Sequence, residues 1–226
     1  MYILDQLRVS PESIIGRNIG FVVAYVKDLA PNAGMGGQCT INCDKLLIEK
    51  HGITVYELLL AKAGGDYFFP YVTKGTVGYL GQKGVGCVDV PKTVPNGTLV
   101  LTPGMNGCSL QVEDIGHNYR FKHYADEMAG KTERHTLCRI DYSDYDPDES
   151  LQRAMMPKGS TDSMRCPQFT LISIKTGENL WKIFSVGVVY YNKSIPYPEG
   201  KKENHLVYDI FSPFKKIKTF RKLKYD

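Results

Sequence analysis

The stretch that decides the fold runs from Gly97 to Asp126 and reads GTLVLTPGMNGCSLQVEDIGHNYRFKHYAD. Apolar and β-branched residues predict a strand over Thr98 to Thr102, and proline, asparagine and glycine predict a turn over Pro103 to Gly107. Cys108 follows that turn directly. Because a thiol in such a position can lie beside unpaired backbone N–H groups that stabilise an oxyanion, Cys108 is a candidate nucleophile.

A β-hairpin is expected directly after Cys108. Ser109 to Asp114 form its first strand, Gly116-His117-Asn118 its turn and Tyr119 to Tyr124 its second strand. Successive side chains of a strand point to opposite faces, so His123 shares one face with Tyr119 and Phe121. We expect this face to point to the interior. Folding the hairpin about its turn therefore brings His123 close to Cys108, whereas the histidine in the turn is expected to be exposed.

The run LTPGMNGCSLQV followed by YRFKH resembles the catalytic signature of the cytotoxic necrotizing factor deamidases and the related Burkholderia lethal factor. In that family a small-residue-Gly-Cys element begins a strand, and a neighbouring strand supplies a histidine. The resemblance implies that Cys108 is the nucleophile and His123 its base. Thr102 stands where the lethal factor places an active-site threonine, which makes it the third candidate site residue.

The resemblance implies hydrolysis of a glutamine side-chain amide in a host protein, a small GTPase or a translation factor, without a metal or organic cofactor. Protease or transglutaminase chemistry would use the same Cys108 and His123 pair. A non-catalytic β-sandwich that binds a partner is the alternative from a different class. In that case Cys108 is an inert core thiol, as most buried cysteines are.

Composition favours one β-rich domain over residues 1–226. A chain of 226 residues with 42% hydrophobic content can bury one substantial core, and its 15 tyrosines and 9 phenylalanines are typical of strands. We expect an α+β fold with a central, mainly antiparallel β-sandwich surrounded by helices and long loops. The net charge of +4 does not indicate a nucleic-acid-binding protein.

The chain shows no apolar run of membrane-spanning length, so stable membrane insertion is not expected. The N-terminal sequence MYILDQLRVSPES lacks a basic region followed by an apolar core and a cleavage site. We expect a monomeric protein that is secreted without a signal peptide and acts in the target-cell cytosol. A cytoplasmic location is the alternative.

Six cysteines in a chain of this length are too few to indicate a disulfide framework, so we expect reduced thiols. Cys39 and Cys43, with His51 downstream, suggest a metal site. A second pair of ligands is missing, so ordinary thiols are the preferred interpretation. Five acidic residues between Asp141 and Glu149 suggest calcium, but they lack the EF-hand order, and a solvated acidic loop is preferred.

Two segments carry helical patterns. Residues Cys43 to Lys62 have apolar positions at helical spacing, with Gly52 as an interruption, and predict one or two helices. Near the C-terminus, apolar residues recur every third position among lysines, which predicts one apolar helical face; these are Phe214, Ile217, Phe220 and Leu223.

Strands and long loops account for much of the remaining chain. Ile19 to Val26 predicts a buried strand, and Gln168 to Lys175 with Trp181 to Asn192 predict a hairpin. Glycine-broken Leu29 to Gln38 and polar Asp144 to Ser163 are expected as surface loops. Loops that flank a catalytic rim commonly provide specificity, so these two are the candidate contacts with a protein target.

Overall fold

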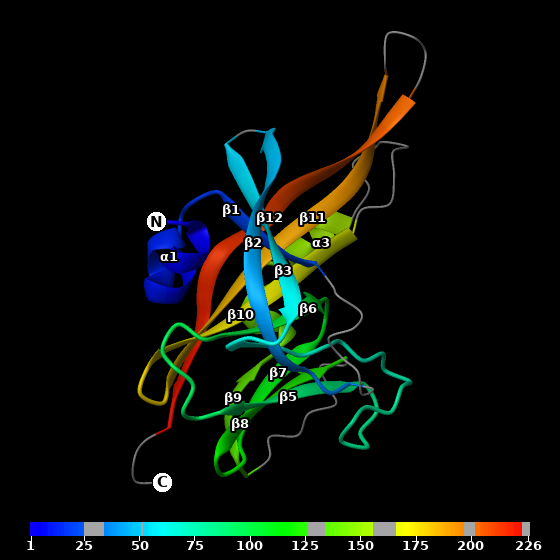
Figure 1. Ribbon diagram of the computed structural model, residues 1–226. Coiled ribbons are helices and arrows are strands. Elements are labelled where there is room, and N and C mark those ends of the chain that lie inside the picture. The colour runs from blue at the N-terminus through cyan, green and yellow to red at the C-terminus, as the bar shows by residue number, and fades with distance from the viewer. Residues whose placement is uncertain (25–33, 51, 126–133, 156–165, 197–201, 223–226) are drawn as a thin grey trace.

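The computed structural model describes residues 1–24, 34–50, 52–125, 134–155, 166–196 and 202–222 (Figure 1). The strands are β1 (Ile19–Ala24), β2 (Gly37–Lys50), β3 (Ile53–Lys62), β4 (Asp66–Phe68), β5 (Val85–Pro91), β6 (Leu99–Met105), β7 (Ser109–Asp114), β8 (Asn118–Tyr124), β9 (Thr136–Ile140), β10 (Cys166–Gly177), β11 (Leu180–Pro196) and β12 (Lys202–Arg221). The helices are α1 (Ile3–Val9), a 3-10 turn (Pro11–Ile14), α2 (Tyr142–Tyr145) and α3 (Ser150–Met155).

The strands form two sheets. An eight-stranded sheet, called the large sheet below, has the order β1-β3-β2-β4-β6-β10-β11-β12, and a four-stranded small sheet has the order β5-β8-β7-β9. The pairs β1–β3 and β4–β6 are parallel, and the other pairs are antiparallel. This arrangement confirms the expected α+β class with mainly antiparallel sheets.

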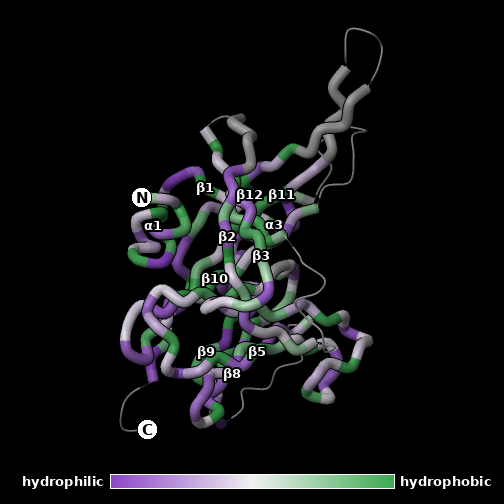
Figure 2. The backbone as a smooth tube through the Cα atoms, in the orientation of Figure 1, coloured by the Kyte–Doolittle hydropathy of each residue, from purple (hydrophilic) through white to green (hydrophobic). Residues whose placement is uncertain are grey.

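The large sheet separates two hydrophobic cores. One face is covered by α1 and the 3-10 turn and encloses the first core. Across this core, β1 lies close to β11 and β12. The other face packs against the small sheet and encloses the second core. Neighbouring residues of β11 illustrate the division, because Ile183 lies in the second core and Phe184 in the first. In Figure 2 hydrophobic segments accordingly recur along the strands.

The hairpin after Cys108 is confirmed. Strands β7 and β8 pair antiparallel, with Leu110 opposite His123, and the side chains of Tyr119 and Phe121 lie in the second core. The strand predicted from Thr98 is β6, but it continues to Met105 and shortens the predicted turn.

The helices predicted over Cys43 to Lys62 are wrong, because these residues lie in the β2–β3 hairpin. Gly52 has a φ of 72° and lies in the turn between the two strands, a conformation that suits glycine. Strand β3 pairs with β2 on one side and with β1 on the other. Both edges of its backbone are thus hydrogen-bonded, and this tertiary pairing overrides the helical spacing.

The C-terminal helix is also wrong, since Phe214, Ile217 and Phe220 lie on β12. Ile217 is skipped in the register, in which Ile183 faces Lys218 and Phe184 faces Lys216. This β-bulge adds one residue to the strand and changes the face to which the following side chains point. Phe214 therefore packs in the first core and Phe220 in the second. Leu223 lies outside the described residues.

The acidic segment after β9 is more ordered than the solvated loop we expected. It contains α2 and α3, and Asp146 is buried, accepting hydrogen bonds from the backbone N–H groups of Ser150 and Leu151. Residues 156–163 of the predicted loop lie outside the described chain. So do residues 29–33 of the other predicted loop, and its last two residues begin β2.

The remaining strand predictions are confirmed as β1, which ends at Ala24, and the β10–β11 hairpin. Residues 25 and 26 of the first predicted strand lie outside the described residues. All six cysteines are thiols rather than disulfides. Among the helices of the described ranges, none has the length and apolar character needed to cross a membrane.

Candidate active site

A buried hydrogen bond between Thr102 and His123 forms the centre of the candidate site. Thr102 lies on β6 of the large sheet and His123 on β8 of the small sheet, so the two side chains meet between the layers. Thr102 Oγ1 lies 2.7 Å from His123 Nδ1, and both residues are wholly buried. The contact holds the imidazole in one orientation and satisfies one of its two nitrogens.

The other imidazole nitrogen is unsatisfied. Among the described residues, His123 Nε2 is buried and has no hydrogen-bond partner. The ring of Phe69 packs against the imidazole with 6.5 Å between centroids, and that of Tyr71 with 5.4 Å. Burial lowers the pKa of His123 to about 3, because the charged form would lose its hydration. The imidazole is therefore neutral at pH 7.

Cys108 lies directly before the hairpin that carries His123. It follows Gly107, whose φ of 78° turns the chain, and it immediately precedes β7. Its side chain lies in the second core and is 3% exposed. Leu110 faces His123 in the register, and Cys108 lies two residues before Leu110, directly outside β7. The hairpin thus places Cys108 and His123 at the same end of the small sheet, where β7 begins and β8 ends.

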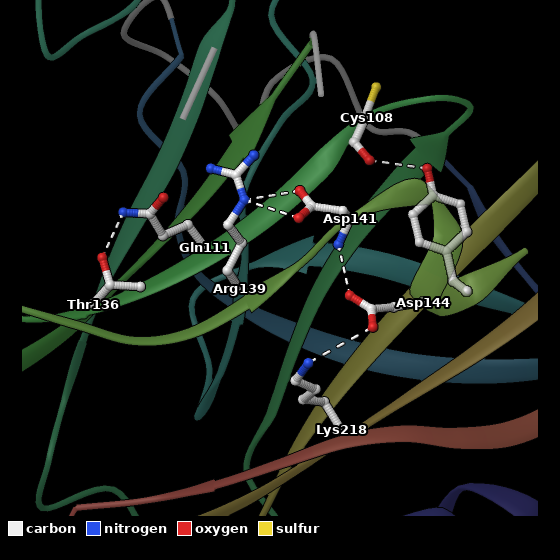
Figure 3. A network of polar contacts seen from close by, with 8 residues as sticks. Cys108, Gln111, Thr136, Arg139, Asp141, Asp144 and Lys218 are labelled. Carbon is white, nitrogen blue, oxygen red and sulfur yellow. Dashed lines mark hydrogen bonds and ion pairs between the residues drawn. The ribbon is translucent and has the colours of Figure 1, made fainter. Parts of the chain in front are cut away.

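Tyr145 is a site residue that sequence reasoning missed. Its hydroxyl donates a hydrogen bond to the backbone carbonyl of Cys108 at 2.9 Å, and its ring packs edge-on against Phe169. Figure 3 shows the Cys108 carbonyl oriented toward this hydroxyl while the sulfur points away. The available signal was a pair of tyrosines, Tyr142 and Tyr145, within an acidic run, which is uninformative without the fold.

Polar contacts from β9 and β12 hold the first turn of α2, the helix that carries Tyr145. Asp141 and Asp144 form a capping box at the start of α2, and Lys218 of β12 lies 3.6 Å from Asp144 (Figure 3). Asp141 also accepts a hydrogen bond from Arg139 at 2.8 Å. Two of the acidic residues that suggested calcium, Asp141 and Asp144, therefore serve as a helix cap and ion pairs at the start of α2.

The other candidate residues lie away from this centre. His117 is exposed in the turn between β7 and β8, as predicted. Cys39 and Cys43 lie on β2, and His51 is outside the described chain. Across the residues that the structure describes, no cluster of three or more histidine, cysteine or acidic side chains is arranged to hold a metal. Burial raises the pKa of Cys39 to about 12, as expected for an unreactive core thiol.

No protein-family model matches the chain, and no curated protein matches it in sequence. Among solved structures, it is similar to the C-terminal domain of CNFy from Yersinia pseudotuberculosis, a toxin domain, with 9% identical residues and a TM-score of 0.25. The match covers 76% of this chain and 72% of that domain. A TM-score this low does not establish a shared function, so function is inferred from the residues of the site.

Proposed function

We propose that the chain is a thiol-dependent hydrolase that deamidates a glutamine side chain of a target protein. Cys108 is the nucleophile, His123 the general base and Thr102 the residue that positions the base. The observation that carries the proposal is the buried 2.7 Å contact between Thr102 Oγ1 and His123 Nδ1. It orients the imidazole on β8, which pairs with the strand directly after Cys108, and leaves Nε2 available to accept a proton.

The proton transfer requires a neutral imidazole with the proton on Nδ1. Burial lowers the pKa of His123 to about 3, so the ring is neutral at pH 7. In the tautomer that the reaction needs, Nδ1–H donates to Thr102 Oγ1, and the lone pair on Nε2 accepts the thiol proton. The hydroxyl oxygen of Thr102 then stabilises the imidazolium that forms.

The reaction proceeds in two halves. Cys108 Sγ attacks the carboxamide carbon as its proton passes to Nε2, and collapse of the tetrahedral oxyanion expels ammonia, which takes the proton from His123. Water then attacks the resulting thioester, His123 again transfers the proton, and glutamate and the thiol are released. Backbone N–H groups near Cys108 stabilise each oxyanion, a contribution of about 3 kcal/mol per donor in serine hydrolases.

The proposed target is a host protein, and the sequence resemblance suggests a small GTPase or a translation factor. The protein would then be a toxin or effector that reaches the target-cell cytosol without a signal peptide. Side chains and water supply every step of the mechanism, so no cofactor is assigned to it.

Incubation of the wild-type protein and of Cys108→Ser with a eukaryotic cell lysate tests the proposal. We expect glutamine-to-glutamate conversion, detected by peptide mass spectrometry, with the wild type alone. Ammonia release without peptide cleavage or amine incorporation would separate deamidation from protease and transglutaminase activity. Equal conversion by a well-folded Cys108→Ser protein would contradict the assignment of the nucleophile.

The second candidate function is a non-catalytic β-sandwich that binds a partner. The observation in its favour is burial, because Cys108 is 3% exposed and His123 is 0% exposed. Alkylation of the folded protein by iodoacetamide distinguishes the two functions. A Cys108 thiol that reacts only after denaturation favours the binding protein, whereas reaction in the folded state favours the enzyme.

A further inference from the structure

The loop formed by residues 70–84, called the 70–84 loop, lies between β4 and β5. A hydrogen bond of 2.8 Å from the Gly84 backbone N–H to the Thr76 carbonyl closes it, and a β-bridge pairs Val77 with Lys83. In Figure 1 the loop extends to the lower right, beside β5. Most of its residues are exposed, so its shape is maintained largely by its own backbone bonds.

The 70–84 loop presents apolar side chains to solvent. Tyr71 is 42% exposed, Val77 51% and Tyr79 56%. The other large hydrophobic side chains that are exposed in the described ranges all lie within residues 1–15. Exposed apolar residues concentrated on one ordered loop are typical of a surface that contacts another protein.

The charged residues of the 70–84 loop are all positive. The loop carries Lys74 and Lys83, and no aspartate or glutamate occurs between Asp66 and Asp89. A partner that pairs with Lys83 and with the apolar side chains must present acidic residues beside an apolar contact. The loop therefore fits a folded protein with an acidic surface better than it fits a small neutral amide.

Tyr71 connects this loop to the candidate active site. Its ring meets the His123 imidazole edge-on, with 5.4 Å between centroids. The other aromatic ring on the imidazole, Phe69, is wholly buried, whereas Tyr71 is partly exposed. Tyr71 thus lies on the solvent side of an imidazole that is itself 0% exposed. A substrate side chain that approaches from this side has to displace the ring.

We propose that the 70–84 loop is the docking surface for the protein substrate, and that docking moves Tyr71 away from His123. The inference rests on the proposed deamidase function and identifies the acidic, partly apolar protein surface that this site would act on. Tyr71 acts as a positioning residue, because it controls access to the imidazole without taking part in bond making. Specificity for one glutamine requires such contacts, since the carboxamide itself is common to every glutamine.

A loop variant with Val77→Ser, Tyr79→Ser and Lys83→Glu tests docking. The matched control carries Tyr2→Ser, Val9→Ser and Lys216→Glu, changes of the same chemistry at exposed positions elsewhere in the fold. We expect Cys108-dependent deamidation of lysate proteins to fall at least ~10-fold in the loop variant and to be unchanged in the control. The rate of Cys108 alkylation by iodoacetamide should stay within about twofold of the wild type.

Modification with diethyl pyrocarbonate measures the accessibility of His123 independently of enzymatic activity. We expect His123 to be protected in the wild type and in Tyr71→Phe, and to react several-fold faster in Tyr71→Ala, as measured by peptide mass spectrometry. Tyr71→Phe keeps the aromatic ring against the imidazole and removes only the hydroxyl. Protection of His123 in Tyr71→Phe but not in Tyr71→Ala would therefore show that the ring, and not the hydroxyl, covers the imidazole. Equal protection in all three proteins would overturn the role of Tyr71.

Other outcomes separate this inference from the proposed function. Unchanged deamidation by the loop variant, or an equal loss in the control, would overturn docking on the 70–84 loop while leaving the deamidase intact. Loss of Cys108 alkylation in the loop variant would overturn it too, because the loop would then support the site. If the triple variant does not fold, Lys83→Glu alone should reduce deamidation at low salt and match the wild type near ~0.5 M salt. No Cys108-dependent deamidation by the wild type would overturn both proposals.

Discussion

The hydrogen bond between Thr102 and His123 joins the two sheets of the protein through side chains. Thr102 belongs to β6 of the large sheet and His123 to β8 of the small sheet, and among the described residues the named strands of one sheet do not pair with those of the other. This contact therefore has two effects, because it orients the imidazole and it connects the layers around the second core. Variants can separate its effect on the imidazole from its effect on the stability of the fold.

Replacement of Thr102 by valine should lower both stability and activity. Valine has nearly the same shape but leaves the buried Nδ1 of His123 without a partner, at a cost of about 1–3 kcal/mol in the free energy of unfolding. Denaturant unfolding measures this cost, and deamidation in lysate measures the activity. Thr170→Val is the matched control, because the Thr170 hydroxyl is buried and has no hydrogen-bond partner in the described part of the chain. A comparable loss in both variants would contradict a specific role for the Thr102 contact.

The stability of the protein should fall as the pH is lowered below about 6.5, through His123. The unfolded histidine has a pKa of about 6.5, whereas burial lowers the pKa of His123 to about 3 in the folded state. The unfolded state therefore binds more protons between these values, and stability is complete above the unfolded pKa and lost as the pH falls toward 3. The slope is roughly 1.4 kcal/mol per pH unit well below the unfolded pKa.

Unfolding between pH 7 and pH 5 isolates this effect, since carboxylates titrate mostly below that range. The slope should be reduced in His123→Gln and retained in His117→Gln, because His117 is exposed in a turn. A wild-type slope that persists in His123→Gln would show that another group causes the acid destabilisation.

The two histidines should also differ in activity. His123→Ala removes the proposed base, and we expect deamidation to fall by at least ~10²-fold, as is typical for the loss of general acid–base catalysis. His117→Ala should retain most activity, since that residue is exposed in the turn between β7 and β8. Rates in lysate with each purified variant provide the measurement, and the reverse order would assign the base to the turn.

Tyr145→Phe should impair the site through the backbone of Cys108. The variant keeps the aromatic packing but removes the hydroxyl that donates to the Cys108 carbonyl at 2.9 Å. Loss of this bond should cost about 1–3 kcal/mol of stability, because the acceptor is buried, and should reduce the rate of deamidation. Tyr119→Phe removes a comparable hydroxyl bond to Asn179, away from the site, and should leave activity unchanged. Equal activity of Tyr145→Phe and the wild type would exclude a positioning role for the hydroxyl.

The hairpin was predictable because its signals are local. Alternation over β7 and β8 and the residues of the intervening turn specify strand, turn and strand within a short stretch of chain, and the same alternation places His123 on the inner face. The errors arose where local spacing competes with pairing between segments. Strand β3 has helical spacing, but its backbone is paired on both edges. In β12 the apolar residues recur every third position, and a bulge at Ile217 accommodates this spacing within a strand.

The sequence by itself determined the β-rich class, the hairpin and the strand start directly after Cys108, since these depend on backbone preferences of adjacent residues. Only the tertiary structure decided that Thr102 meets His123 across two sheets, that Tyr145 holds the Cys108 carbonyl and that Tyr71 lies against the imidazole. These contacts join residues from different elements. They depend on how the layers pack and which groups are left buried, and short-range sequence patterns do not encode that information.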